Sequence, residues 1–255
     1  MGKADIEGGE PMIVYSNGDS YGLAATGLVH RVYSEFIAEK LNAKLINKGK
    51  RGSCNERIIR TTTRDLLEIR EKTDEQILAL INVSDVWRSE IWPQENKYPE
   101  ENDGHFQSFQ ISSLDTNVIH TTKNDSKVYS EFFKFWFLTA DYEALISNLY
   151  YKLILMTNLL KTKKINYLIW SGSRNFKEIS YKIDTNAPFM KCFSSMIEND
   201  KNILPLGTFT FCDYLLNQGF KPIDHDRYGD DGHHGEPAHQ VFAEHLLENY
   251  IKNIL

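Results

Sequence analysis

The stretch MIVYSNGDS, residues 12–20, decides how the rest of the chain is interpreted. Its first half, Met12 to Ser16, is a short apolar run that ends in the turn signal Asn17-Gly18-Asp19. A run of this length bounded by a turn is typical of a strand that is buried on both faces. Such strands belong to parallel sheets, in which functional residues gather at the carboxyl ends. The sequence therefore predicts that the chemistry begins directly after this strand.

Helical and strand-like patterns alternate downstream of the first strand. Apolar residues recur every three or four positions over 28–41 and again over 58–69, which indicates two helices that each bury one stripe. Short apolar runs at 44–47, 76–83 and 166–170 indicate three further strands. The alternation predicts an α/β fold, with an open parallel sheet that helices cover on both faces.

We expect one domain over residues 1–255, with a polar insertion at about 92–127. A chain of 255 residues can bury a full core, and no repeat or Pro/Gly/Ser-rich linker divides it. A helical pattern over 128–160 follows the insertion, and its aromatic run Phe132–Phe137 is expected in the core or in an oligomer interface. A last amphipathic helix is expected over 239–255.

The composition excludes several classes of protein. The chain has 35 acidic and 29 basic residues, a net charge of −6, so we expect no nucleic-acid partner. Hydrophobic residues at 41% and charged residues at 25% argue against disorder and fibrous repeats. Cys54, Cys192 and Cys212 include no CxxC pair, so they are expected as free thiols in a reducing compartment. No signal peptide or membrane span is recognisable, so we expect a cytoplasmic protein with no membrane partner.

The motif Gly18-Asp19-Ser20 places a hydroxyl between the first strand and the first helix. A serine at this edge of the sheet can act as a nucleophile, because backbone amides and a helix N-terminus can face it. The alternative is that Asp19 and Ser20 only cap the helix while the glycine makes the turn.

A second polar cluster, Asp230-Asp231-Gly232-His233-His234, precedes the last helix. A serine nucleophile needs a base within hydrogen-bond reach, and the base needs a carboxylate that holds its tautomer. Asp230 and His233, three residues apart on one loop, can supply both groups. A solvated loop and a metal site remain as alternatives, and the metal site would draw on His225, Asp226, Asp230, Asp231, His233, His234 or His239.

Two more segments end predicted strands at the same edge of the sheet. Residues 47–55 contain Gly49 and Gly52, and the N–H of Gly52 can help to form an oxyanion hole. The alternative is a tight turn in which Ser53 or Asn55 caps the next helix. Residues 82–85 follow the third strand, where a side-chain donor would face the same site.

Together the four segments resemble the SGNH hydrolases, also called GDSL-like lipases/esterases. The blocks of that family are a GDS nucleophile, a glycine in a second block, an asparagine in a third and a C-terminal DxxH. The resemblance spans nearly the whole chain. It implies a flavodoxin-like three-layer α/β/α sandwich with a central parallel sheet of about five strands.

The resemblance also implies roles for individual residues. Ser20 would be the nucleophile, His233 the base and Asp230 its orienting partner. The N–H groups of Ser20 and Gly52, with a third-block side chain, would form the oxyanion hole.

Two positions depart from the family pattern. Ser84 aligns with the usual asparagine, and Asn82 lies two residues earlier on the same side of the strand, so the third donor is Ser84 or Asn82. His234 stands where a proline usually follows the histidine, which permits a shifted pair of Asp231 and His234.

The resulting hypothesis is a serine esterase, without a cofactor, that hydrolyses small acyl esters. The family resemblance implies an O-acetyl ester on a carbohydrate as the substrate. Asp19, Asn55 and Arg88 are candidate substrate contacts. The alternatives are an O-acyltransferase with the same triad, a non-catalytic ligand-binding or assembly module, and a metal-dependent hydrolase.

Overall fold

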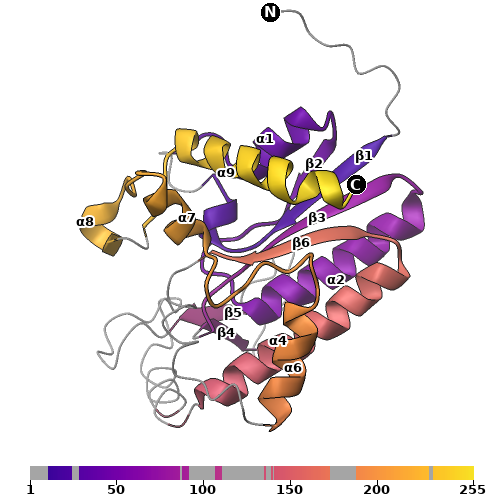
Figure 1. Ribbon diagram of the computed structural model, residues 1–255, viewed down its shortest axis with the longest axis vertical. Helices are drawn as coiled ribbons and strands as arrows, with labels where there is room; N and C mark the ends of the chain where they lie inside the picture. The colour runs from indigo at the N-terminus through magenta and orange to yellow at the C-terminus, as the bar shows by residue number, and fades with distance from the viewer. Residues whose placement is uncertain are drawn as a thin grey trace, which may run out of the picture.

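A computed structural model of the protein describes residues 11–24, 29–86, 88–91, 107–110, 135, 139, 141–172, 188–229 and 232–255. Its centre is a sheet with helices on both faces (Figure 1). The sheet contains β1 (Met12–Asn17), β2 (Lys44–Asn47), β3 (Gln76–Val83) and β6 (Asn166–Ser171), all parallel. These are the four strands that the apolar runs predicted.

The strands follow the order β2-β1-β3-β6, so β1 and β3 lie side by side at the centre. The chain leaves β1 toward β2 and then crosses back over β1 to reach β3. A reversal of this kind opens a crevice at the carboxyl ends of the two central strands, where α/β proteins bind their ligands. The loops after β1 and β3 meet at this place.

A short segment extends the sheet beyond β6. The N–H of Ile169 donates to the carbonyl of Asn202 at 2.9 Å, and the N–H of Leu204 donates to the carbonyl of Ile169 at 2.8 Å. Parallel bridges join Ile169 to Ile203 and Ser171 to Thr210. The predicted sheet of about five strands therefore consists of four full strands and this edge segment.

Helices form a layer on each side of the sheet (Figure 1). One face carries α2 (Asn55–Lys72), α4 (Tyr142–Thr162) and α6 (Pro188–Glu198). The other face carries α1 (Tyr33–Lys40), α7 (Phe211–Asn217) and α9 (Glu236–Asn249). The predicted three-layer α/β/α sandwich is confirmed.

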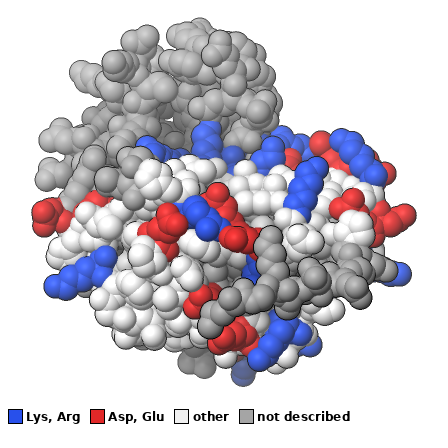
Figure 2. All heavy atoms as spheres, turned by 90° about the horizontal axis from the view of Figure 1, so that it is seen from above, with Lys and Arg blue, Asp and Glu red and all other residues white. Residues whose placement is uncertain are grey.

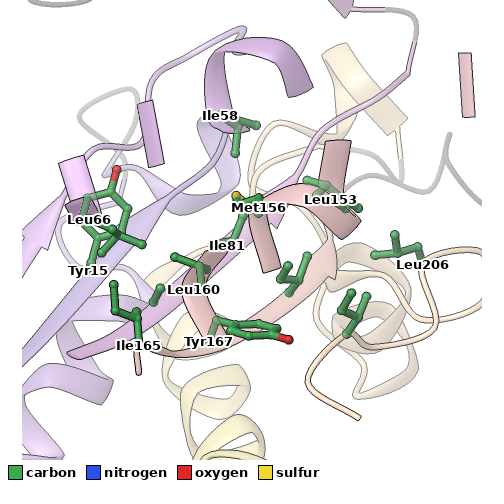
Figure 3. Close-up of a cluster of buried hydrophobic side chains, with 14 of the residues drawn as sticks. Tyr15, Ile58, Leu66, Ile81, Leu153, Met156, Leu160, Ile165, Tyr167 and Leu206 are labelled. Atoms are coloured by element: carbon green, nitrogen blue, oxygen red, sulfur yellow. The ribbon is translucent and has the colours of Figure 1, made fainter. Parts of the chain in front are cut away.

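The layer under α2 and α4 is mainly aliphatic (Figure 3). The buried residues of α4 recur at spacings of three and four, which places them in one stripe along the helix. They are Ile146, Leu149, Leu153, Met156 and Leu160. Burying a side chain of this size contributes about 1.5–3 kcal/mol, so this stripe supplies a large part of the core.

The opposite layer is aromatic. The ring centroids of Phe211 and Phe242 lie 4.9 Å apart, and those of Tyr33 and Trp170 lie 5.3 Å apart, both edge to face. His239 of α9 joins this layer, 5.1 Å from Phe211 between ring centroids. This layer supports the loop that carries His233.

Two predicted helices differ in their bounds, and a third helical pattern lies partly outside the described residues. α1 begins at Tyr33 and not at residue 28, because the Glu35 carboxylate accepts the N–H of Val32 at 2.8 Å and fixes the helix start there. Of the helical pattern expected over 128–160, α4 covers Tyr142–Thr162, Phe135 and Thr139 are also helical, and the rest of the aromatic run at 132–137 lies outside the described residues. α9 ends at Asn249 and a short turn, η3 (Ile251–Asn253), follows it.

Two short strands pair antiparallel at the polar insertion: β4 (Arg88–Ile91) directly precedes it, and β5 (Gln107–Gln110) lies within it. Arg60 of α2 holds this hairpin through two hydrogen bonds to Glu90, of 3.1 and 2.8 Å. The rest of the insertion, 92–106 and 111–127, lies outside the described residues.

The surface in Figure 2 carries Lys and Arg side chains interspersed with Asp and Glu side chains. Among the described residues no helix is long and apolar enough to span a membrane. Phe135, the described member of the aromatic run, is 68% exposed.

Candidate functional site

The turn after β1 presents Ser20 at the carboxyl edge of the sheet. A single helical turn, η1 (Ser20–Gly22), follows the strand, and Asp19 caps it because its Oδ1 accepts the N–H of Tyr21 at 3.1 Å. The Asp19 side chain is fully buried, whereas Ser20 is partly exposed. Of the residues in this motif, Ser20 is therefore the one that is partly open to solvent.

Close packing explains the glycine of this motif. A Cβ at Gly18 would lie 2.8 Å from the Cβ of Asn82 and 3.0 Å from the Asn82 carbonyl oxygen. Any larger residue would therefore push the turn away from β3.

Asn17 anchors the same turn to α2. Its buried Nδ2 donates to the hydroxyls of Thr61 and Thr62 at 2.8 and 2.9 Å, and its Oδ1 accepts the N–H of Gly18 at 2.9 Å. Because these polar groups are buried, losing their partners would cost the full desolvation of each group. Sequence analysis placed Asn17 in the turn signal and gave its side chain no further role.

The loop after β3 binds the turn from the other side. The Ser84 hydroxyl donates to Oδ2 of Asp19 at 2.9 Å, and Nη1 of Arg88 donates to the same oxygen at 2.9 Å. Nη1 of Arg88 also donates to Oγ of Ser84, at 2.8 Å. A carboxylate, a hydroxyl and a guanidinium thus join the first and third loops.

The loop after β2 completes this wall. Lys50 N–H donates to the Gly18 carbonyl at 3.1 Å, and Asn47 Nδ2 donates to the Gly22 carbonyl at 2.9 Å. Asn55 exchanges two hydrogen bonds with the backbone of Ser84, of 2.9 and 2.8 Å. Three loops from three strands are therefore tied into one unit around Ser20.

Two backbone donors of this unit fit the predicted oxyanion hole. Within the described part of the chain, the N–H groups of Ser20 and Gly52 donate no hydrogen bond. Gly52 is exposed and has φ +67, a left-handed conformation that glycine adopts without strain. Both N–H groups are thus available to a bound carbonyl oxygen.

In the structure neither Ser84 nor Asn82, the two third-block candidates, is placed to donate to an oxyanion. The Ser84 hydroxyl has one proton, and it goes to Asp19. The Asn82 side chain is fully buried, and a Cβ at Gly172 would meet its Oδ1 at 2.6 Å. Asn82 therefore packs beneath the turn.

His233 is held by a carboxylate that sequence analysis did not select. Nδ1 of His233 lies 2.6 Å from Oδ2 of Asp224, and the backbone N–H of His233 donates to Oδ1 of Asp224 at 2.6 Å. An ionised carboxylate only accepts hydrogen bonds, so this contact places the proton on Nδ1. The tautomer leaves Nε2 as the basic nitrogen.

The loop folds back on itself to make this contact. Asp224 precedes the short helix α8 (His225–Tyr228), and the N–H of Ile223 donates to the carbonyl of His233 at 2.7 Å. A Cβ at Gly232 would lie 2.4 Å from Oδ1 of Asp224. Glycine at this position is therefore what lets the carboxylate approach His233.

An aromatic contact places His233 beside the nucleophile turn. The centroids of the His233 and Tyr21 rings lie 5.6 Å apart, and Tyr21 directly follows Ser20. The two predicted residues Ser20 and His233, far apart in the sequence, thus come to the same end of the sheet.

The two neighbouring histidines belong to the aromatic layer. His234 is fully buried, with its ring edge-on to Phe211 at 5.8 Å between centroids. Burial and the nearby His234 and His233 lower the pKa of His239 to about 3. His239 is therefore neutral and lies beneath the site as a packing residue.

Several predicted site residues have other contacts than expected or lie outside the described residues. Asp230 and Asp231 lie outside the described residues, so the pairs Asp230/His233 and Asp231/His234 stay predictions. Asp19, Asn55 and Arg88, the candidate substrate contacts, are mostly buried and bind other parts of the protein.

The metal alternative finds no support in the described ranges, where no group of three or more His, Cys, Asp or Glu side chains could hold a metal ion. Asp230 and Asp231, which that alternative also used, are not among them.

Three solved structures align with nearly the whole chain at low sequence identity. A protein assigned to the GDSL-like lipases, from Parabacteroides merdae, is 13% identical with a TM-score of 0.45, and the alignment covers 94% of this chain and 95% of that chain. A protein assigned to the lipolytic G-D-S-L family, from Desulfitobacterium hafniense, is 12% identical with a TM-score of 0.46 over 95% and 99% of the two chains. A catalytic mutant of an acetylxylan esterase from Geobacillus stearothermophilus is 14% identical with a TM-score of 0.38 over 94% and 93%.

No curated protein matches the chain. One family model matches residues 17–181, which is more than half of the sequence. The match includes the Ser20 turn and the loops with Gly52 and Arg88, and it ends before Asp224 and His233. The chain belongs to the family of unknown function DUF6071.

Proposed function

We propose that the protein is a serine esterase in which Ser20, His233 and Asp224 form the triad. The observation that carries the proposal is the contact of 2.6 Å between Nδ1 of His233 and Asp224, on a loop that packs against Tyr21. A histidine oriented by a carboxylate beside a reachable serine is the arrangement that acyl transfer requires.

In the proposed reaction, Oγ of Ser20 attacks the carbonyl carbon of the ester, and its proton passes to Nε2 of His233. Asp224 holds the imidazole in the required tautomer and stabilises the imidazolium that forms. The leaving alkoxide takes the proton from His233 as its bond to the acyl carbon breaks. Water then attacks the acyl-serine by the same route and releases the acid.

The negative charge on the carbonyl oxygen would be met by the N–H groups of Ser20 and Gly52. Each such donor is worth about 3 kcal/mol of transition-state stabilisation. Because the Ser84 hydroxyl is already donated to Asp19, the proposed oxyanion hole relies on these two backbone donors.

We propose small acyl groups, with O-acetyl on a carbohydrate foremost, as the substrate class. This choice rests on the resemblance of the four sequence blocks to the SGNH hydrolases. An O-acyltransferase would use the same residues and would differ only in the acceptor that attacks the acyl-serine.

The test is hydrolysis of p-nitrophenyl acetate by the purified chain, with Ser20→Ala, His233→Gln and Ser195→Ala beside it. Ser195 is an exposed serine of α6 and serves as the matched control. We expect Ser20→Ala and His233→Gln to lose about three orders of magnitude or more in kcat, and Ser195→Ala to match the wild type.

Adding EDTA or a sugar to the same assay separates the other candidate functions. Activity that disappears with EDTA would indicate a metal-dependent hydrolase. Capture of the acetyl group by an added sugar in preference to water would indicate a transferase. Absence of both hydrolysis and transfer in a folded wild-type protein would refute the proposal and leave a binding module. Release of acetate from acetylated xylo-oligosaccharides, compared with longer acyl esters, tests the substrate class.

A further inference from the structure

We infer that Arg88 is a positioning residue for the Ser20 turn, and that it acts through Asp19 instead of binding substrate. The inference rests on the proposed function, since it concerns how the nucleophile of that reaction is held. Nothing in the motif pattern assigns this role, because Arg88 lies beyond the four blocks.

The Asp19 carboxylate is the link between Arg88 and Ser20. One oxygen, Oδ1, accepts the N–H of Tyr21 and so caps the turn that begins at Ser20. The other, Oδ2, accepts from Arg88 and from Ser84. A change at Oδ2 rotates the carboxylate as a whole, so it also moves the cap and the N–H of Ser20.

Among the Arg and Lys ion pairs of the described residues, this one is the most buried. The Asp19 side chain is 0% exposed and that of Arg88 is 12% exposed. Removing one partner of a buried pair leaves an uncompensated charge, whereas exposed pairs contribute little. Arg31 and Glu39, with side chains 39% and 69% exposed, form a pair of the exposed kind.

The main chain of Arg88 is held independently of the turn. Arg88 begins β4, and Arg60 of α2 holds the same strand through Glu90. The N–H of Arg88 also donates to the Asp85 carbonyl at 3.2 Å. Arg88 therefore transmits the position of α2 and the hairpin to Asp19.

A substrate-binding role makes a different prediction. If Arg88 bound an anionic group of the substrate, its loss would raise KM for anionic esters and leave neutral esters unaffected. A positioning role lowers the acylation rate for neutral and anionic esters alike, with KM little changed.

The experiment measures acylation of Ser20 in the wild type, Arg88→Met, Arg88→Lys and Asp19→Asn/Arg88→Met. The probes are p-nitrophenyl acetate, the anionic mono-p-nitrophenyl succinate and a neutral fluorophosphonate. With the last, the Ser20 Oγ–phosphorus bond forms, fluoride leaves and the serine proton passes to His233. Arg31→Met, which breaks the exposed Arg31–Glu39 pair, is the matched control, and Ser20→Ala shows which labelling is specific.

We expect Arg88→Met to slow acylation by about tenfold or more with all three probes, and Arg88→Lys to recover most of the rate. The double variant should be faster than Arg88→Met alone, because it no longer buries an unpaired carboxylate. Arg31→Met should stay within about twofold of the wild type.

The inference is overturned if Arg88→Met labels as fast as the wild type, or if its defect is confined to the succinate ester. If Arg88→Met does not fold, Arg88→Lys and the double variant are compared with the wild type instead. Acylation rates that are equally low in these two variants would also overturn the inference. If the wild type does not label Ser20, the proposed function fails. In that case a double-mutant cycle in urea unfolding still decides the Asp19–Arg88 coupling.

Discussion

The two ends of the candidate site are held in different ways. At the Ser20 end, three loops share buried hydrogen bonds, and Asn17 and Asp19 each join the turn to a different neighbour. At the His233 end, one loop is closed mainly through a single carboxylate, Asp224, and packs on the aromatic layer.

The comparison teaches that the Ser20 turn is anchored by contacts with three loops, whereas the His233 loop depends mainly on Asp224. Perturbing the buried polar contacts around Ser20 should cost stability as well as rate. Perturbing the contact of His233 with Asp224, whose side chains are 18% and 16% exposed, should cost rate with little change in stability. The predictions below test this difference.

The largest effect is expected at Asp224. Asp224→Asn keeps the shape but no longer fixes the proton on Nδ1 of His233, so kcat should fall about 10⁴-fold while the thermal midpoint barely changes. Asp226→Asn, an exposed neighbour, is the control and should behave as the wild type. If Asp230→Asn abolished the activity and Asp224→Asn did not, Asp230 would be the partner of His233.

Gly232→Ala should have the next largest effect. The added Cβ would lie 2.4 Å from Oδ1 of Asp224, so the carboxylate must shift away from His233. Moving a catalytic group by about 1 Å costs about 10²-fold in kcat. Gly235→Ala is the control, because its Cβ would meet nothing closer than 3.5 Å. Equal kinetics for the two variants would contradict the role of Gly232.

At the other end of the site, Asn17→Ala should destabilise the fold. It removes the donor to the Thr61 and Thr62 hydroxyls, and we expect the free energy of unfolding to fall by about 2–3 kcal/mol in urea titrations. The exposed Asn158→Ala should change it by less than about 0.5 kcal/mol. If Asn17→Ala lowered activity without lowering stability, the two ends of the site would not differ in the way described above.

The smallest effect concerns His239 and pH. Its pKa is about 3 in the folded protein, against an ordinary value of 6.5, because it is buried near other histidines. Between these values the unfolded chain binds a proton here that the folded chain does not, so acidification destabilises the fold. The expected slope is up to about 1.4 kcal/mol per pH unit.

The His239→Gln variant cannot bind this proton in either the folded or the unfolded state. Urea unfolding at pH 7, 6 and 5 should therefore show the wild type losing more stability on acidification than the variant. Stability curves that run parallel for the two proteins would contradict a neutral buried His239.

Sequence patterns predicted the sheet well because its strands are buried on both faces. Of the eight residues of β3, seven are buried, so its apolar run is nearly continuous. The segment at 202–204 and the strands β4 and β5 were not predicted. They are short and polar or lie at an edge, so no periodic burial shapes their sequence.

The candidate site was predictable where a residue's place depends on local sequence. Ser20 and Gly52 follow predicted strands directly, and the structure places both at the expected edge. The partner of His233 depends on how a loop folds back, and four aspartates lie between 224 and 231. Only the closure of Ile223 on His233 places Asp224 at the imidazole, and no spacing rule describes that closure.

The order β2-β1-β3-β6 has a consequence for synthesis on the ribosome. The three loops around Ser20 are complete once β4 has emerged, and β6 then adds to a sheet that already holds the buried Asp19–Arg88 pair. His233 and α9 follow β6 in the sequence and pack onto the aromatic face afterwards. A nascent chain thus carries the assembled Ser20 turn well before His233, the base of the proposed triad, has been synthesised.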